Sequence, residues 1–200
     1  MPDQLPRLSP LTGLAGASVL PGRSDAGLVV EELAFFTHIN LRGRANDAAF
    51  LAETQRHLGV PLPLRPNTIS NAGELTAFWL GPDEWLITIS PSSAKIPIAL
   101  LRNGLRGLRF SVTDISDGQT ILHLRGSRVL DVLRKGCSLD LRAPAFGAGF
   151  CAQTMIAKTG ALIGCIDPPS SLYLIVRRSF AEYLALWLKD AATEYGFRML

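Results

Sequence analysis

An internal repeat is the feature of this sequence that most constrains its fold. Residues 39–44 (INLRGR) are echoed by residues 122–127 (LHLRGS), at a shift of 124 − 41 = 83 positions between the two leucines that precede Arg-Gly. In each copy a strand pattern ends in Leu-Arg-Gly and leads directly into the start of a helix. Residues 81–89 are echoed in the same way by residues 168–176. The order of elements repeats while few identities remain, which indicates a duplicated unit.

The pattern of apolar residues predicts which segments form each copy. We expect strands at 28–33, 35–41, 75–80, 85–89, 110–115, 119–124, 151–157, 161–166 and 172–176. We expect helices from Asn46 or Asp47 to His57, after Pro97 to about Gly104, from Ser127 to Lys135, and from Ser179 onward. Strand pairs that alternate with helices in this way predict an α+β fold, with one or two helices on one face of a mostly antiparallel sheet in each copy.

Helix boundaries can be predicted from capping residues. Gly59 is expected to end the first helix, and Ser127 to cap the helix that Gly136 closes. Residues 179–182 (SFAE) have the spacing of a capping box. The last helix is then expected to bury one apolar stripe. Its members are Phe180, Leu184, Trp187, Leu188 and Ala191.

The domain organisation follows from the repeat and from local composition. Residues 1–27 are rich in Pro, Gly and Ser and have no steady period, so we expect an arm or loop there. Residues 28–200 are expected to form one domain of two pseudo-repeats, at about 28–105 and 108–200. Residues 61–73 are expected to be a loop.

Composition excludes several classes of protein. The chain of 200 residues is 48% hydrophobic and 18% charged, which is a globular composition rather than a disordered one. A net charge of +3 without a clustered basic stripe gives no support for nucleic-acid binding. No apolar run reaches the roughly 18 residues of a membrane span, and residues 1–10 lack the pattern of a secretion signal. We therefore expect a cytoplasmic protein that binds neither membrane nor nucleic acid.

The cysteines and histidines predict no metal or disulfide site. Three widely spaced cysteines, without a Cys-x-x-Cys pair, favour buried thiols over zinc or redox chemistry. The three histidines have no second ligand at a suitable spacing. These six residues are Cys137, Cys151, Cys165, His38, His57 and His123.

Catalytic motifs are also missing from the sequence. It contains no Gly-x-Gly-x-x-Gly, P-loop or Gly-x-Ser-x-Gly pattern. Asp114 and Asp117 could act as an acid–base pair, but turn-forming aspartates that bond to their own backbone are favoured. Asp83 and Glu84 are read in the same way, as turn residues before a strand.

The tryptophans are the candidates for packing anchors. Trp79 and Trp85 bracket the turn at 81–84, where they can be core residues or an exposed anchor for a partner; core is favoured. Trp187 is expected in the core beneath the last helix.

Five segments in this order resemble the gamma subunit of heterotetrameric sarcosine oxidase. They are residues 79–86 (WLGPDEWL), 113–120 (TDISDGQT), 134–141 (RKGCSLDL), 151–154 (CAQT) and 173–180 (YLIVRRSF). The resemblance extends from about Leu28 to the C-terminus.

That family is similar in turn to the folate-binding domain of the glycine-cleavage aminomethyltransferases. The similarity centres on residues 114–116, 124–126 and 159–163. Those enzymes carry adjacent aspartates shortly after the Gly turn, and one of the two is needed for folate chemistry. Alignment from Gly160 places Gly164 and Cys165 at these positions, and neither is a carboxylate. Asp167 could replace them only through a slip of two residues in register, which keeps the face of a strand.

The resemblance implies the function of the complex. It implies oxidative demethylation of sarcosine to glycine, with FAD, FMN, NAD and tetrahydrofolate held by partner subunits. It implies alpha, beta and delta subunits as partners, and for this chain a structural role with no catalytic, cofactor-binding or metal-binding residues.

Two alternatives stay open. The chain could be a stand-alone folate-binding protein or aminomethyltransferase-like enzyme, with a carboxylate in its pocket at Asp114 or Asp167. It could instead be the gamma subunit of an oxidase for a related N-methyl amino acid, since the substrate contacts would lie in another chain.

Overall fold

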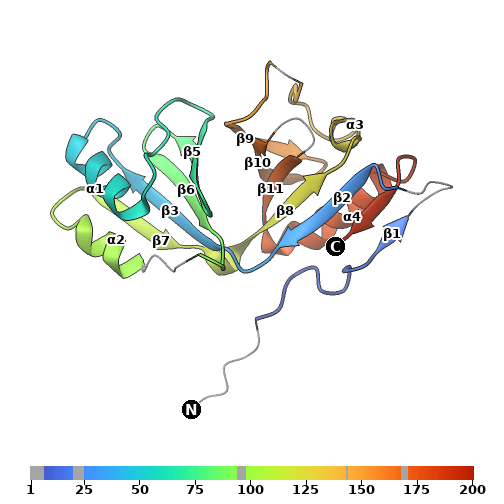
Figure 1. The fold of residues 1–200 in the computed structure, drawn as a ribbon, viewed down its shortest axis with the longest axis horizontal. Helices are drawn as coiled ribbons and strands as arrows, with labels where there is room; N and C mark the ends of the chain where they lie inside the picture. Colours follow the sequence, from blue (N-terminus) through green and yellow to red (C-terminus); the bar gives the residue numbers. More distant parts are fainter. Residues whose placement is uncertain (1–6, 20–24, 94–97, 143, 168–170) are drawn as a thin grey trace, which may run out of the picture.

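The protein folds into two β-sheets that face each other, with helices on the outer side of each (Figure 1). The computed structural model describes residues 7–19, 25–93, 98–142, 144–167 and 171–200. All but one of the strand pairings in this part are antiparallel; β12 and β2 run parallel. The expected α+β class with mostly antiparallel sheets is confirmed.

The N-terminal sheet has the order β4-β5-β6-β3-β7. Its strands are β3 (Thr37–Gly43), β4 (Ile69–Ala72), β5 (Leu75–Gly81), β6 (Glu84–Ile89) and β7 (Phe110–Asp114), and its helices are α1 (Ala48–Leu58) and α2 (Ile98–Gly104). Both helices lie on the side away from the other sheet (Figure 1).

The C-terminal sheet has the order β1-β12-β2-β8-β11-β10-β9. Its strands are β1 (Ser18–Val19), β2 (Leu28–Leu33), β8 (Gln119–Arg125), β9 (Phe150–Ile156), β10 (Thr159–Asp167), β11 (Ser171–Arg177) and β12 (Phe197–Met199), and its helices are α3 (Val129–Arg134) and α4 (Ala181–Ala191). Two short 3₁₀ helices, η1 (Ser116–Gly118) and η2 (Arg178–Phe180), complete the described elements.

The repeat in the sequence corresponds to a repeat in strand order. β4-β5-β6-β3-β7 in one sheet matches β9-β10-β11-β8-β2 in the other. The pairing register also repeats: Leu41 lies opposite Trp85, and Leu124 lies opposite Leu172. Leu41 matches Leu124 at the shift of 83 residues, and Trp85 matches Leu172 at the shift of 87 residues that relates 81–89 to 168–176. Residues that are paired in one repeat are thus paired in the other, and the duplicated strand–helix architecture is confirmed.

The first strand of each repeat crosses to the other sheet. β2 precedes β3 in the chain but pairs with β8, and β7 precedes β8 but pairs with β3. Each sheet therefore contains one strand that belongs, by sequence, to the other repeat.

Each sheet packs its outer face on its own helices. In the N-terminal half the rings of Phe50 and Trp85 lie 5.9 Å apart between α1 and the sheet. Trp85 is fully buried, and its indole N–H donates to the Pro63 carbonyl at 2.8 Å. In the C-terminal half, α4 buries a stripe of small and aliphatic residues. Its members are Ala181, Leu184, Ala185, Leu188 and Ala191.

The predicted caps are correct for both ends of α1 and for the C-terminal end of α3, where Gly136 follows the Lys135 cap, whereas the predicted N-terminal caps of α3 and α4 are wrong. The Asp47 carboxylate accepts from the backbone N–H groups of Ala49 and Phe50, and Gly59 adopts a left-handed φ of 73° at the other end. Ser127 does not cap α3: Arg128 takes the N-cap position without a side-chain hydrogen bond, and its own N–H donates to the Gly27 carbonyl at 3.0 Å.

The capping box expected at residues 179–182 is absent. Arg178–Phe180 form a 3₁₀ turn before α4, so Phe180 takes the capping position without a side-chain bond. Phe180 is consequently exposed rather than part of the buried stripe. Trp187 is partly buried against the core beside α4.

Three strands were not expected from the sequence. β4 lies within the segment expected to be a loop, β1 lies within the segment expected to be an arm, and β12 follows the last helix. Leu11, which precedes β1, is buried in the C-terminal core. Pro97, expected in the first turn of α2, lies outside the described residues.

Candidate functional site

The inner faces of the two sheets meet in a small apolar cluster, which we call the seam. Strand residues alternate between faces, so those not used in the outer cores point toward the other sheet. The seam consists of Phe78, Leu86, Ile121, Cys151, Leu162 and Ile175. This cluster joins residues of both sheets in one buried apolar contact.

Backbone hydrogen bonds also join the sheets along the seam. Thr68, just before β4, forms a bridge with Phe150 of β9. The N–H of Ile69 donates to the Gly149 carbonyl, and the N–H of Cys151 donates to the Asn67 carbonyl. The Gln153 amide donates to the Leu80 carbonyl at 2.8 Å. These bonds fix the relative position of the two halves.

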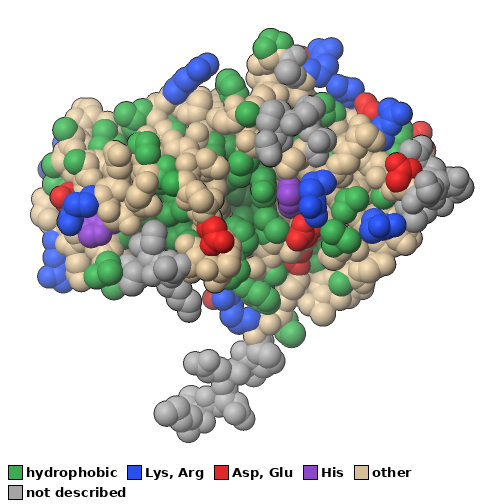
Figure 2. Space-filling model, in the orientation of Figure 1, with side chains coloured by type: hydrophobic (Ala, Val, Ile, Leu, Met, Phe, Trp, Pro, Cys, Tyr) green, Lys and Arg blue, Asp and Glu red, His purple; other side chains and the backbone are tan. Residues whose placement is uncertain are grey.

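A hollow opens at one end of the seam, and we call it the seam hollow. Its volume is about 230 Å³, and its lining includes Leu33, Phe36, Glu74, Phe78, Ile121 and Tyr173. Figure 2 shows hydrophobic side chains gathered in the recess between the two halves, with one histidine at its edge.

Phe78 occupies the space that a carboxylate at position 164 would need. Gly164 lies in β10 between Tyr173 and Cys151 of the neighbouring strands. A Cβ atom on Gly164 would lie 2.8 Å from Cε1 of Phe78, which is closer than real contacts of this kind. Cys165 points the other way, into the C-terminal core. The positions that the resemblance aligns with the aminomethyltransferase aspartates thus offer no carboxylate at the seam.

Asp167 ends β10, where its backbone pairs with Ser171. Its side chain lies outside the described part of the structure, so its position relative to the seam stays a prediction from the sequence.

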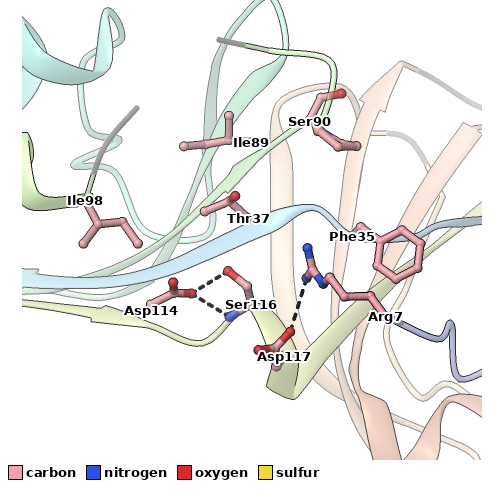
Figure 3. Close-up of a pocket in the computed structure, with 10 residues that line it drawn as sticks. Arg7, Phe35, Thr37, Ile89, Ser90, Ile98, Asp114, Ser116 and Asp117 are labelled. Atoms are coloured by element: carbon pink, nitrogen blue, oxygen red, sulfur yellow. Dashed lines mark hydrogen bonds and ion pairs between the residues drawn. The ribbon is translucent and has the colours of Figure 1, made fainter. Parts of the chain in front are cut away.

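Asp114 and Asp117 lie at a different place, in a cavity of about 740 Å³ beside the start of β3 (Figure 3). Asp114 accepts hydrogen bonds from the backbone N–H and the hydroxyl of Ser116. Asp117 points away from it and pairs with Arg7 at 3.2 Å, with both side chains largely exposed. Burial raises the pKa of Asp114, but the hydrogen bonds from Ser116 outweigh it and hold this pKa below its usual value. Asp114 therefore closes a turn with Ser116, and Asp117 forms an exposed ion pair with Arg7.

His38 is buried beside this turn. Its Nδ1 lies 3.1 Å from the Gln119 side-chain oxygen, and its backbone N–H donates to the Ser116 hydroxyl. Burial lowers the pKa of His38, although Gln119 and the Asp114 charge act to raise it. The imidazole is thus a neutral, packed group that joins β3 to η1 and β8.

The structure brings together a serine, a histidine and a glutamate that the sequence did not connect. Glu31, His123 and Tyr173 form one row across β2, β8 and β11. His123 Nε2 lies 2.8 Å from the Ser171 hydroxyl, and the imidazole stacks on Tyr173 with centroids 4.5 Å apart. Burial and Arg125 lower the pKa of His123, and Glu31 raises it.

This group lacks the geometry of a catalytic triad. Glu31 lies 3.9 Å from His123 Nδ1, too far for the hydrogen bond that orients the base. Glu31 instead pairs with Arg125. The signal in the sequence was the alternation within 119–125 and 171–177, but only the strand register shows which residues become neighbours.

The remaining candidates have structural partners. Asp83 accepts from the backbone N–H of Ala45, and Glu84 accepts from Asn40 and Arg42 of β3. Trp85 is buried, as expected, whereas Trp79 is only partly buried.

The cysteines are buried thiols that form no disulfide. Burial raises the pKa of the Cys151 thiol at the seam to about 11, so it is protonated and unreactive at neutral pH. Within the described ranges, no group of three or more His, Cys, Asp or Glu side chains could hold a metal ion. None of the described helices has the length and apolarity needed to cross a membrane.

Comparison with known proteins places the chain in a family. Residues 42–194 match the model of the sarcosine oxidase gamma subunit family. The gamma subunit of sarcosine oxidase from Arthrobacter sp. is 35% identical over 194 residues, covering 95% of this chain and 92% of the relative. The corresponding subunit from Corynebacterium sp. strain U-96 is 31% identical over 195 residues, with the same coverage.

Solved structures agree with the sequence comparison. A chain of heterotetrameric sarcosine oxidase from Corynebacterium sp. U-96, in complex with pyrrole 2-carboxylate, superposes with a TM-score of 0.83 at 28% identity, covering 94% of this chain and 96% of that one. Aminomethyltransferase T from Bartonella henselae shares the fold with a TM-score of 0.62 at 13% identity, covering 88% of this chain and 48% of that one. The chain belongs to the sarcosine oxidase gamma subunit family.

Proposed function

We propose that this chain is a structural, non-catalytic subunit of a heterotetrameric sarcosine oxidase. In this proposal the alpha, beta and delta subunits carry FAD, FMN, NAD and tetrahydrofolate, and the complex oxidises sarcosine to glycine. The gamma chain contributes a packed surface for assembly. Residues 28–200 act as its domain of two repeats, at about 28–105 and 108–200, with residues 1–27 as an added arm.

The contact between Gly164 and Phe78 is the observation that carries the non-catalytic role. Folate chemistry of the aminomethyltransferase kind needs a carboxylate, which the resemblance places at Gly164 or Cys165. A side chain at Gly164 would collide with Phe78, and Cys165 faces the outer core. An unpaired carboxylate at the apolar seam would also cost several kcal/mol to bury. The residues present do not fit a folate-converting site.

Other features fit the same role. The two aspartates that line the larger cavity are engaged with other groups: Asp114 with Ser116 and Asp117 with Arg7. Buried thiols without disulfides suit the reducing cytoplasm, which we propose as the location.

The test is reconstitution with the native neighbouring subunits. We expect the tagged chain to co-purify with a flavin-coloured complex that forms peroxide from sarcosine, while the isolated chain is colourless and inactive. Titration of the isolated chain with tetrahydrofolate should give no heat of binding. Micromolar binding that is lost in Asp114→Asn or Asp167→Asn would overturn the proposal in favour of a stand-alone folate protein. A higher kcat/KM of the complex for another N-methyl amino acid would change the substrate but keep the role of this chain.

A further inference from the structure

The seam hollow has one apolar wall and one polar wall. The apolar wall consists of Leu33, Phe36, Ile121 and Tyr173, from β2, β8, β11 and the β2–β3 connection. The other wall comes from the N-terminal sheet and holds the polar residues Glu74, Thr76 and Thr88 beside Phe78. A ligand that fits both walls must carry an apolar stem and a polar head.

The volume of the hollow indicates what kind of group can fill it. Its volume of about 230 Å³ is below the roughly 300–1,000 Å³ of typical small-molecule sites. The hollow is also open to solvent between the two halves (Figure 2). A single long side chain from another protein fits these limits better than a cofactor does.

The carboxylate of Glu74 indicates that the side chain entering the hollow is positively charged. It lies in the two-residue turn between β4 and β5, where Gly73 adopts a left-handed φ of 59°. The N–H of Ser90 donates to its backbone carbonyl, and the Ser92 hydroxyl donates to its carboxylate at 2.9 Å. Within the described ranges no Lys, Arg or His forms an ion pair with Glu74, unlike Glu31, which pairs with Arg125. Among the residues that the structure describes, the exposed Glu74 carboxylate therefore has a hydroxyl donor but no basic partner.

The apolar wall suits a basic side chain. Long basic residues lay their aliphatic stems on apolar surface while the charged end reaches a polar partner. The rings of Phe36 and Tyr173 line the same hollow, and aromatic faces attract cations. An arginine adds a planar fork that can meet a carboxylate and stack on a ring at once.

We propose that the seam hollow receives a basic side chain, arginine or lysine, from a larger subunit of the oxidase, and that Glu74 is its ion-pair partner. This inference rests on the proposed function, because it needs a complex in which the chain is an assembly subunit. It assigns the cleft between the repeats a role in subunit contact.

The test compares variants of Glu74 in the co-expressed complex. The affinity of the tagged chain for the remaining subunits is measured for wild type, Glu74→Gln and Glu74→Lys, with Glu182→Lys on the exposed face of α4 as the matched charge control. We expect Glu74→Gln to weaken binding at least ~30-fold, as expected for loss of one member of a close interfacial pair. Glu74→Lys should abolish co-purification, while Glu182→Lys binds like wild type.

The outcomes separate this inference from the proposed function. If wild type fails to associate with the other subunits, the proposed function is wrong. If wild type associates and Glu74→Lys associates as tightly, the inference is overturned and the proposed function stands. Thermal unfolding of the isolated chains is the second readout. A fall for Glu74→Gln that clearly exceeds the fall for Ser92→Ala, which removes the hydroxyl donor of the carboxylate, would place the counter-charge inside this chain and would also overturn the inference.

Discussion

The two halves of the chain share a strand order, but they fill their cores in different ways. The N-terminal half packs the large rings of Phe50 and Trp85 between one sheet face and α1. The C-terminal half has Leu172 at the position equivalent to Trp85, and extends its sheet with β12 and β1. Duplication has therefore preserved backbone pairing, whereas the side chains of each half have adapted separately.

The largest expected effect comes from removing the aromatic core of the N-terminal half. Trp85→Ala should lower the free energy of unfolding by ~3–5 kcal/mol, because it empties a fully buried site and leaves the Pro63 carbonyl without its donor. Urea denaturation followed by circular dichroism measures the loss, with Leu172→Ala as the counterpart. Trp85→Leu places the residue of the other repeat at this position, and wild-type stability for that variant would show that the two cores are interchangeable.

Gly43 and Gly126, the glycines of the two Leu-Arg-Gly motifs, should differ in whether a second substitution can restore the stability lost when they are replaced by alanine. A Cβ on Gly126 would lie 2.3 Å from the Gly27 carbonyl oxygen, at a φ of 128°, so Gly126→Ala should cost ~2–3 kcal/mol. The three atoms nearest to a Cβ on Gly43 all belong to the ring of Phe50, the closest at 2.2 Å. Gly43→Ala should cost ~1–3 kcal/mol, and much less in a Phe50→Leu background.

A double-mutant cycle makes this comparison quantitative. Strong coupling between positions 43 and 50, without any rescue of Gly126→Ala by Phe50→Leu, is the expected result. Additive losses at 43 and 50 would contradict the contact.

Acid should destabilise the protein through its buried histidine. Burial lowers the pKa of His38 in the folded state, so the unfolded chain binds its proton more readily. The stability from neutral His38 is complete above the unfolded pKa of about 6.5 and is lost as the pH falls toward the folded pKa. One proton gives a slope of no more than ~1.4 kcal/mol per pH unit.

The control is His38→Gln, measured by thermal unfolding between pH 7.5 and 5.5. We expect a shallower pH dependence in this variant than in wild type. An unchanged slope would assign the effect to His123, the less deeply buried histidine of the other half, whose pKa is lowered by burial and by Arg125.

The smallest effect concerns the two helices that follow the Leu-Arg-Gly motifs. Asp47→Ala should cost ~1 kcal/mol, because two backbone N–H groups of α1 lose their acceptor. Ser127→Ala should change stability by less than ~0.5 kcal/mol, because Ser127 is exposed and does not cap α3. Chemical denaturation of both variants decides the point; equal losses would mean that Ser127 does act as a cap in solution.

Local signals in the sequence were sufficient for most elements and for both ends of α1. Alternation located β8, short apolar runs located β5, β6 and β11, and Asp47 with Gly59 defined α1. Ser127 and Ser179 carried the same local signal but do not act as caps, because α3 starts one residue later, at the Arg128 cap position, and a 3₁₀ turn precedes α4. A serine with capping preference therefore does not by itself fix the residue at which a helix begins.

The candidate site depended more on register than on residue type. The row of Glu31, His123 and Tyr173 joins residues that are far apart in the chain, and the contact of Gly164 with Phe78 joins the two repeats. The absence of a carboxylate at Gly164 and Cys165 could be inferred from the resemblance. That Phe78 occupies the space, and that Glu74 faces the hollow, could not, because neither follows from spacing along one strand.

The exchange of β2 and β7 between the sheets has a consequence for how this chain folds. Neither sheet can be completed until residues from both repeats are present, so closing them requires contacts between distant parts of the sequence. Such long-range closure slows folding relative to a chain of independent repeats. It also couples the repeats, so that they should unfold in a single cooperative transition. A fragment ending near residue 105 would lack β7 and leave β3 as an open sheet edge, so a ribosome must release most of the chain before either half is stable.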